Sequence, residues 1–155
     1  MAKKVFPFLK DFRQKRGYDY SFNLEENKGK LDELEDFAGV YIIEAADHSK
    51  FSCPVGSSSI IYIGKSDHIK RRLKEHLSNL LLLKEDKDYG IYGAEPCWLN
   101  SRYQFMHYSH GAIVYIYKCL KKQEAKDLEA DILWGYYTKY RCLPIGNGAR
   151  SFRKE

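Results

Sequence analysis

Residues 60–76 contain several side chains whose types and spacing could act on a phosphate. The segment reads IIYIGKSDHIKRRLKEH, so a short apolar run ends in a Gly-Lys-Ser turn and a basic stretch follows. The basic side chains in it include Lys65, Lys70, Arg71, Arg72, Lys74 and His76. Such cations can bind a phosphate and stabilise the charge that builds on it during hydrolysis. They can equally well form the solvated face of a helix, and their positions around that helix separate the two interpretations.

A helical projection divides these basic residues into two groups. Successive residues turn by about 100° in a helix, which places four apolar residues on one stripe: Ile69, Leu73, Leu77 and Leu80. His76 lies within this stripe, and Arg72 lies one turn earlier at its edge. The others, Lys70, Arg71 and Lys74, point elsewhere and form a solvated face. Taken alone, a histidine there is more often a core residue and an arginine more often an ion-pair partner. Their occurrence together, beside strands that carry tyrosines, favours a site.

A second helix, predicted for residues 122–140, carries a carboxylate on its apolar side. Its stripe consists of Ala125, Leu128, Ile132, Leu133, Tyr136 and Tyr140. Glu129 falls inside this stripe, where a carboxylate is costly unless it is paired or bound to a metal ion. The pattern leaves two interpretations open, namely a functional carboxylate and a structural ion pair with an arginine.

Two predicted strands each carry a tyrosine among aliphatic residues. Residues 39–45 (GVYIIEA) and 59–64 are rich in β-branched and aromatic residues, which favours strands. The segment between them, residues 46–58, contains Pro, Gly and several Ser, as is typical of a loop. We therefore expect an antiparallel hairpin with a long loop, with Tyr41 on one strand and Tyr62 on the other. Most buried tyrosines are structural, so neither one indicates a function by itself.

The remaining predicted elements complete an α+β domain. A helix over residues 66–84, a strand over 112–118 and the helix over 122–140 follow the hairpin, in the order β-β-α-β-α. This order predicts a small, mostly antiparallel sheet of three strands flanked by helices. We divide the chain into an N-terminal arm with short helices (1–37) and a main domain (38–155).

Composition and charge favour a nucleic-acid partner and exclude a membrane protein. The net charge is +5, and the basic residues concentrate in residues 1–16 and 64–76, whereas residues 25–36 are acidic. A basic balance favours an anionic partner. The longest aliphatic run is four leucines, far too short to span a bilayer. The four cysteines show neither CxxC pairs nor zinc spacing with histidine, and no signal peptide is visible. We therefore expect free thiols and a cytoplasmic location.

An ordered set of motifs resembles the GIY-YIG nuclease superfamily. The chain has GVY at residues 39–41, YIG at 62–64, Arg72 ten residues after Tyr62, and later Glu129. His76 and a Pro-x-x-Asn sequence that ends at Asn147 complete the set. The resemblance covers about residues 38–148. It departs from the family pattern in Val40, in the long loop between the two tyrosines, and in the long gap between Glu129 and Pro144.

The resemblance implies a GIY-YIG-like fold and divalent-metal-dependent hydrolysis of DNA phosphodiester bonds. It implies that Glu129 is the only protein ligand of one Mg²⁺ (or Mn²⁺) ion, whose other ligands are waters and phosphate oxygens. By the same resemblance, Tyr41 activates the attacking water beside Tyr62. The site is completed by Arg72 and Lys65, which stabilise phosphate charge, by His76, which orients a tyrosine or contacts the phosphate, and by Asn147, which supports the site.

Substrate contacts are predicted more broadly. We expect nucleic acid to meet a set of basic and aromatic residues: Lys70, Arg71, Lys74, Trp98, Arg102 and Tyr103. DNA is the expected partner and RNA is not excluded. One active site cuts one strand, so a double-strand break implies a homodimer or two successive nicks.

Two other classes of function compete with the nuclease. A non-catalytic nucleic-acid-binding module would need only the basic and aromatic residues, but it gives no reason for Glu129 on an apolar face. A P-loop nucleotide-binding site is disfavoured although Gly64-Lys65-Ser66 matches the end of its motif, because position 59 is Ser where the motif needs Gly.

Overall fold

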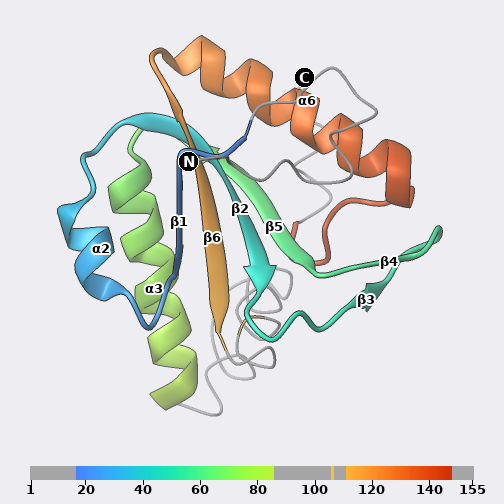
Figure 1. Ribbon diagram of the computed structural model, residues 1–155, viewed down its shortest axis with the longest axis horizontal. Helices are drawn as coiled ribbons and strands as arrows, with labels where there is room; N and C mark the ends of the chain where they lie inside the picture. Colours follow the sequence, from blue (N-terminus) through green and yellow to red (C-terminus); the bar gives the residue numbers. More distant parts are fainter. Residues whose placement is uncertain (1–16, 86–105, 107–110, 148–155) are drawn as a thin grey trace.

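The computed structural model describes residues 17–85, 106 and 111–147, and a four-stranded antiparallel sheet forms its centre (Figure 1). The strands lie in the order β1-β6-β2-β5. The helices and strands are β1 (Tyr20–Asn23), α2 (Lys28–Glu33), β2 (Ala38–Ala45), β3 (Phe51–Ser52), β4 (Ser57–Ser58), β5 (Ile60–Ser66), α3 (Ile69–Glu85), β6 (Ala112–Cys119) and α6 (Lys122–Tyr140). The predicted α+β class and the β-β-α-β-α order of the main elements are confirmed.

The sheet has one strand more than the three that the sequence predicts. β1 pairs antiparallel with β6, from Tyr20 opposite Ile116 to Asn23 opposite Ile113. This short segment lies in the region assigned to an N-terminal arm. A four-residue strand has too little pattern to be recognised, and its partner lies some ninety residues later in the chain. The division of the chain at residue 38 stays a prediction.

β2 is the central strand and is buried on both faces. It pairs with β6 on one side and with β5 on the other, both antiparallel. Seven of its eight residues are buried. A strand covered on both sides reads as a continuous apolar run instead of an alternating one, as GVYIIEA does.

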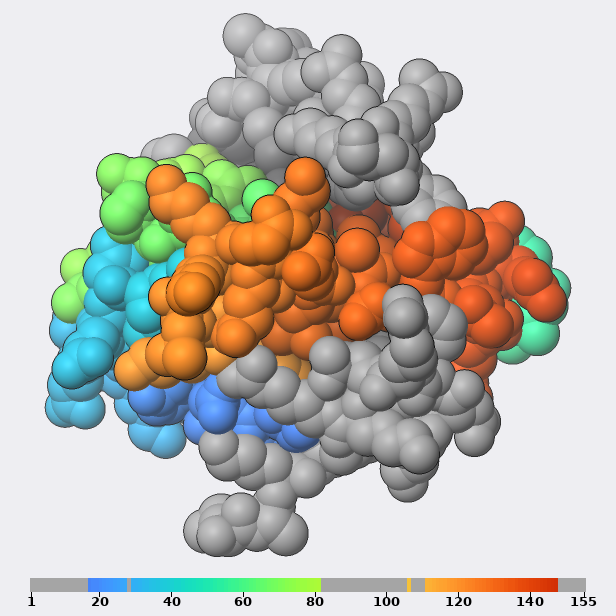
Figure 2. Space-filling view, turned by 90° about the horizontal axis from the view of Figure 1, so that it is seen from above, coloured from blue at the N-terminus to red at the C-terminus, as the bar shows by residue number. Residues whose placement is uncertain are grey.

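A helix covers each face of the sheet. On the α3 face, α3 and α2 pack on the side chains of Tyr41, Ile43 and Tyr62. On the α6 face, α6 packs on Val40, Ile42 and other residues of the sheet. Figure 2 shows α2 and the start of β2 in blue to cyan next to green α3, while the red end of α6 lies at the opposite side. The terms α3 face and α6 face are kept below.

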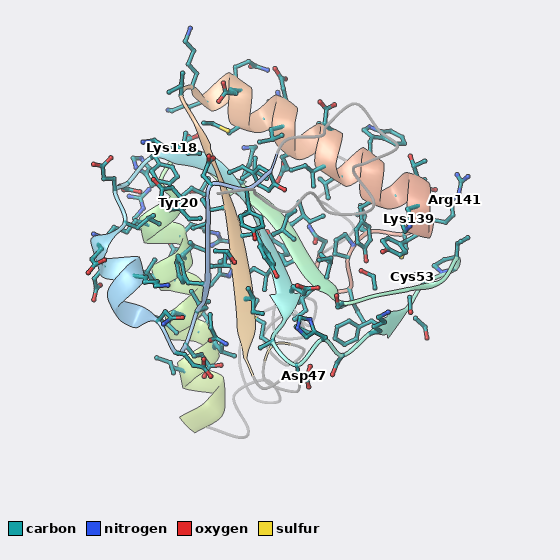
Figure 3. All side chains as sticks on the ribbon, in the orientation of Figure 1. Tyr20, Asp47, Cys53, Lys118, Lys139 and Arg141 are labelled. Atoms are coloured by element: carbon teal, nitrogen blue, oxygen red, sulfur yellow. The ribbon has the colours of Figure 1, made fainter. Side chains whose placement is uncertain are left out.

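The connection between β2 and β5 is an antiparallel hairpin, as predicted, but its loop forms a ribbon of its own. Strands β3 and β4 pair with each other there. The ribbon reaches the end of α6, where the Val55 amide donates to the Tyr140 carbonyl over 3.3 Å. Cys53 accordingly lies near Lys139 and Arg141 in Figure 3. Across the described part of the chain, no helix is long and apolar enough to span a membrane.

Candidate active site

Two tyrosines and a histidine from three different elements meet in the core of the α3 face. Tyr41 comes from β2, Tyr62 from β5 and His76 from α3. The Tyr41 hydroxyl and His76 Nε2 share a buried hydrogen bond of 2.7 Å. The three rings lie within 5.4–5.8 Å of one another, centroid to centroid. Both Tyr41 and His76 are fully buried, and Tyr62 is 9% exposed. We call these three residues the Tyr–His cluster.

The geometry of the sheet brings the two tyrosines together. Ile43 lies opposite Tyr62 and Tyr41 lies opposite Gly64, so the tyrosines are diagonal neighbours on one face. Gly64 leaves space for the Tyr41 ring. A Cβ atom at this position would lie 2.6 Å from Tyr62 Cε2 and 2.8 Å from the Tyr41 hydroxyl oxygen. Glycine is therefore needed here because both rings press on the backbone of β5.

Arg72 lies one turn before His76 on α3 and is half-buried. Its side chain is 32% exposed, and its Nη1 atom lies 3.0 Å from Oε2 of Glu75. The prediction that His76 faces the sheet is confirmed, since it is completely buried. Arg72 lies at the boundary between the core and solvent. It can keep its charge there and still reach a phosphate at the surface.

Lys65 and Glu129 belong to the α6 face. Lys65 lies opposite Val40, whose side chain packs in the core beneath α6, so strand alternation directs both to that face. Lys65 itself is exposed. Glu129 is half-buried on α6 next to Leu128, which is buried. The stripe predicted for this helix is buried apart from Tyr140, which is half-buried, and Glu129, predicted to lie within the stripe, is half-buried as well. The predicted site residues thus divide between the two faces of the sheet.

Asn147 holds the C-terminal loop against the outer edge of β5. Its Oδ1 atom accepts a hydrogen bond of 3.0 Å from the Ile63 amide, and its Nδ2 atom donates to the Ile63 carbonyl over 2.8 Å. The Gly146 amide donates to the Ile61 carbonyl over 2.7 Å. Asn147 therefore supports the strand that carries Tyr62, at the residue that follows this tyrosine.

Two of the basic residues predicted to contact nucleic acid, Lys70 and Lys74, are paired within the chain. Lys70 Nζ donates to the Asp32 carbonyl over 2.8 Å, and Lys74 Nζ lies 3.3 Å from Asp32 Oδ1. Arg71 is exposed on the same side of α3. The aromatic and basic candidates of the irregular segment, namely Trp98, Arg102 and Tyr103, lie outside the described residues.

A second buried polar cluster, which the sequence analysis missed, lies on the α6 face. Glu44 is 7% exposed and accepts hydrogen bonds from Tyr115 over 2.7 Å and from Ser59 over 2.5 Å. Burial raises the pKa of the Tyr115 hydroxyl, and the hydrogen bond to Glu44 raises it further. We call Glu44, Ser59 and Tyr115 the Glu–Tyr cluster. A glutamate inside the otherwise apolar run GVYIIEA was the available signal for it.

Comparison with known proteins gives one match. A family model described as GIY-YIG catalytic domain matches residues 37–141. This range contains β2, β5, α3, β6 and α6, and it includes the whole Tyr–His cluster, Arg72 and Glu129. No curated protein and no solved structure gives a significant match.

Proposed function

Because the chain belongs to the GIY-YIG family, a nuclease superfamily, we propose that it is an endonuclease which hydrolyses DNA phosphodiester bonds with a divalent metal ion. The observation that carries this proposal is the Tyr–His cluster. Three residues that are far apart in the chain meet in it, and a hydrogen bond of 2.7 Å joins two of them. Such a pair can move a proton between a phenol and an imidazole.

We assign the activation of water to Tyr41. A free phenol has a pKa near 10, so it is a poor base at neutral pH unless a neighbour stabilises its anion. His76 Nε2 is placed to accept the phenolic proton, and the nearby charge of Arg72 favours the anion. Tyr62 is the more exposed tyrosine, at 9%, and its ring lies 5.8 Å from that of Tyr41, so we assign to it the side from which water enters. His76 thus acts through Tyr41, as a positioning residue.

The single carboxylate of Glu129 suits a hard cation that keeps most of its waters. Mg²⁺ is commonly bound through one or two carboxylates together with waters and substrate phosphates. Within residues 17–85, 106 and 111–147, no three His, Cys, Asp or Glu side chains are grouped to form a metal cage. A half-buried single carboxylate such as Glu129 fits a site in which waters and substrate phosphates supply the other ligands. When bound, Mg²⁺ or Mn²⁺ would polarise the phosphate as a Lewis acid.

We place the scissile phosphate at β5, because this edge strand borders both faces of the sheet. Arg72 approaches from the α3 face and Lys65 from the α6 face. Their positive charges would stabilise the charge that builds on the phosphate in the transition state. Water attacks phosphorus as Tyr41 takes its proton, the bond from phosphorus to the 3′ oxygen breaks, and that oxygen takes up a proton from solvent. The products carry 5′-phosphate and 3′-hydroxyl ends.

The proposal extends to the setting of the reaction. We propose a cytoplasmic setting, in which cysteine thiols stay reduced; of the cysteines that the structure describes, Cys53, Cys119 and Cys142 form no disulfide. DNA is the proposed substrate, and RNA is the alternative to be tested beside it. Each copy cuts one strand, so a double-strand break requires two copies or two successive nicks.

The test is cleavage of supercoiled plasmid with Mg²⁺ or Mn²⁺, compared with the same reaction in EDTA. Glu129→Ala is expected to reduce cleavage at least about 100-fold, because it removes the metal carboxylate. Asp127→Ala is the matched control, since Asp127 is an exposed carboxylate on the same helix. Cleavage that survives Glu129→Ala would contradict the metal assignment. Binding of DNA without cleavage under any metal condition would instead favour a non-catalytic binding module.

A further inference from the structure

The acidic segment Asp32–Asp36 lies against basic side chains on the outer side of α3 and at the end of β6. Asp32 pairs with Lys74 at 3.3 Å, and its carbonyl accepts from Lys70. The contact of Glu35 is longer. Glu35 Oε2 lies 3.9 Å from Lys118 Nζ. Two carboxylates of one short segment, those of Asp32 and Glu35, thus face lysines that could otherwise contact phosphate.

Asp36 has both a structural and an electrostatic contact. Its Oδ1 atom accepts a hydrogen bond of 3.2 Å from the Lys70 amide in the first turn of α3. Its Oδ2 atom lies 3.3 Å from His68 Nδ1. Asp32, by contrast, touches α3 only through its carbonyl and its ion pair. Its carboxylate can therefore be changed without removing a helix-capping contact.

The segment is held in place by the core. Leu31 is 1% exposed and Leu34 is 7% exposed, and both pack beneath α3 with residues of the sheet. Figure 2 shows this part of the chain beside α3. The carboxylates are thus fixed next to the lysines in the folded protein.

The paired lysines line an open groove along α3. Its volume is about 610 Å³, and its walls include Lys70, Arg71 and Lys74 together with Asp36 and Glu75. The pair of Lys74 and Asp32 is solvent-exposed, with side-chain exposures of 50% and 69%. Exposed ion pairs are weak and exchange partners readily. A phosphate group can therefore displace Asp32 from Lys74.

We propose that the carboxylate of Asp32 competes with DNA phosphates for Lys74 of α3, and so restrains the affinity of this surface for DNA. The inference rests on the proposed function, since it concerns how the same protein holds its substrate. A lysine that pairs with phosphate releases a condensed counterion, which drives non-specific binding. A lysine that must first break an ion pair with a carboxylate contributes less free energy to DNA binding. The groove is then a weak contact that adds to binding only where the active site is already engaged.

The experiment measures binding of a fluorescent DNA duplex by anisotropy over a range of salt concentrations, using the full chain. Asp32→Asn is expected to tighten binding about two- to fivefold, the usual range for one exposed ion pair. It should also steepen the plot of log K against log salt by about 0.9, the value for one additional phosphate contact. Asp127→Asn makes the same change in net charge on α6 and is the matched control.

Lys74→Gln completes a double-mutant cycle. In the wild-type chain it should change affinity less than about 1.5-fold, because Asp32 already neutralises this lysine. In the Asp32→Asn background it should remove the entire gain. If the wild-type protein binds and cleaves DNA but Asp32→Asn and Asp127→Asn bind DNA with equal affinity, this inference is overturned and the proposed function stays intact. Absence of DNA binding and cleavage in every variant would overturn both.

Discussion

On the α3 face of the sheet Tyr41 shares a hydrogen bond with the imidazole of His76, whereas on the α6 face Tyr115 donates to the carboxylate of Glu44. Both clusters are buried and both centre on a tyrosine hydroxyl. The difference lies in the partner. An imidazole ordinarily exchanges protons near neutral pH, whereas the Glu44 contact and burial raise the pKa of Tyr115.

The comparison shows that burial of a polar group does not by itself identify a site. In the Glu–Tyr cluster, each of the two carboxylate oxygens accepts a hydrogen bond from a hydroxyl, which stabilises a fixed arrangement. In the Tyr–His cluster, the half-buried Arg72 lies one turn away on the same helix. We therefore treat the Glu–Tyr cluster as structural and the Tyr–His cluster as catalytic. Three sets of substitutions sharpen or break this distinction.

The largest effect is expected from removal of one hydroxyl in each cluster. Tyr41→Phe should lower the cleavage rate by about 100-fold or more, since it removes the proposed base. Tyr115→Phe should leave the rate within about threefold, because neither Tyr115 nor Glu44 has a role in the proposed chemistry. Each change should reduce the free energy of unfolding by about 1–3 kcal/mol, because a buried partner loses its hydrogen bond.

Rates of plasmid cleavage and urea unfolding curves test the Tyr41→Phe and Tyr115→Phe variants. Similar rate losses for Tyr41→Phe and Tyr115→Phe would remove the distinction between the clusters. Tyr62→Phe tests the assignment of the base in addition. A larger loss for Tyr62→Phe than for Tyr41→Phe would transfer the role of base to the more exposed tyrosine.

A smaller effect, of packing alone, is expected at Gly64. Gly64→Ala places a Cβ 2.6 Å from Tyr62 and 2.8 Å from the Tyr41 hydroxyl, so the rings must shift. We expect a loss of about 1–3 kcal/mol in the free energy of unfolding, typical of overpacking. Gly29→Ala is the control, because nothing lies within 4 Å of its Cβ and alanine favours the helix α2. Thermal denaturation of both variants measures the contrast, and equal stabilities would show that the cluster tolerates displacement.

The smallest effect is expected at Asn147. Asn147→Ala removes both hydrogen bonds to the backbone of Ile63. The free energy of unfolding should fall by about 2 kcal/mol, and cleavage should fall less than tenfold, because the residue acts through β5. Unfolding curves and cleavage rates measure the two effects. A loss of activity above about 100-fold at unchanged stability would mean that Asn147 contacts the substrate itself.

The sequence predicted the main elements well, because their patterns are strong. The continuous apolar run of β2 and the two helical stripes each have a length and period that local physics determines. β1 was missed because it depends on pairing with β6 and not on its own four residues. The boundaries of α3 and α6 agree with the expected ranges to within about three residues.

The site was predicted less completely. Helical projection alone placed His76 in the core and Glu129 near it, but the roles of the tyrosines came from the family resemblance. No pattern could show that Asp32 would neutralise Lys74, because this pairing depends on how α2 packs on α3. For the same reason, only the three-dimensional structure shows that Lys65 and Glu129 lie on the opposite face of the sheet from Tyr41 and Tyr62.

The hydrogen bonds of Gly146 and Asn147 have a consequence for assembly. They occupy the Ile61 carbonyl and both backbone groups of Ile63, which point outward from β5. An exposed strand edge is a template on which a second chain can add a strand, and a covered edge resists this. Two copies that cut both strands of a duplex would therefore have to associate through other surfaces, or meet only on the DNA. The loop that steadies Tyr62 also keeps this edge of the sheet from joining another.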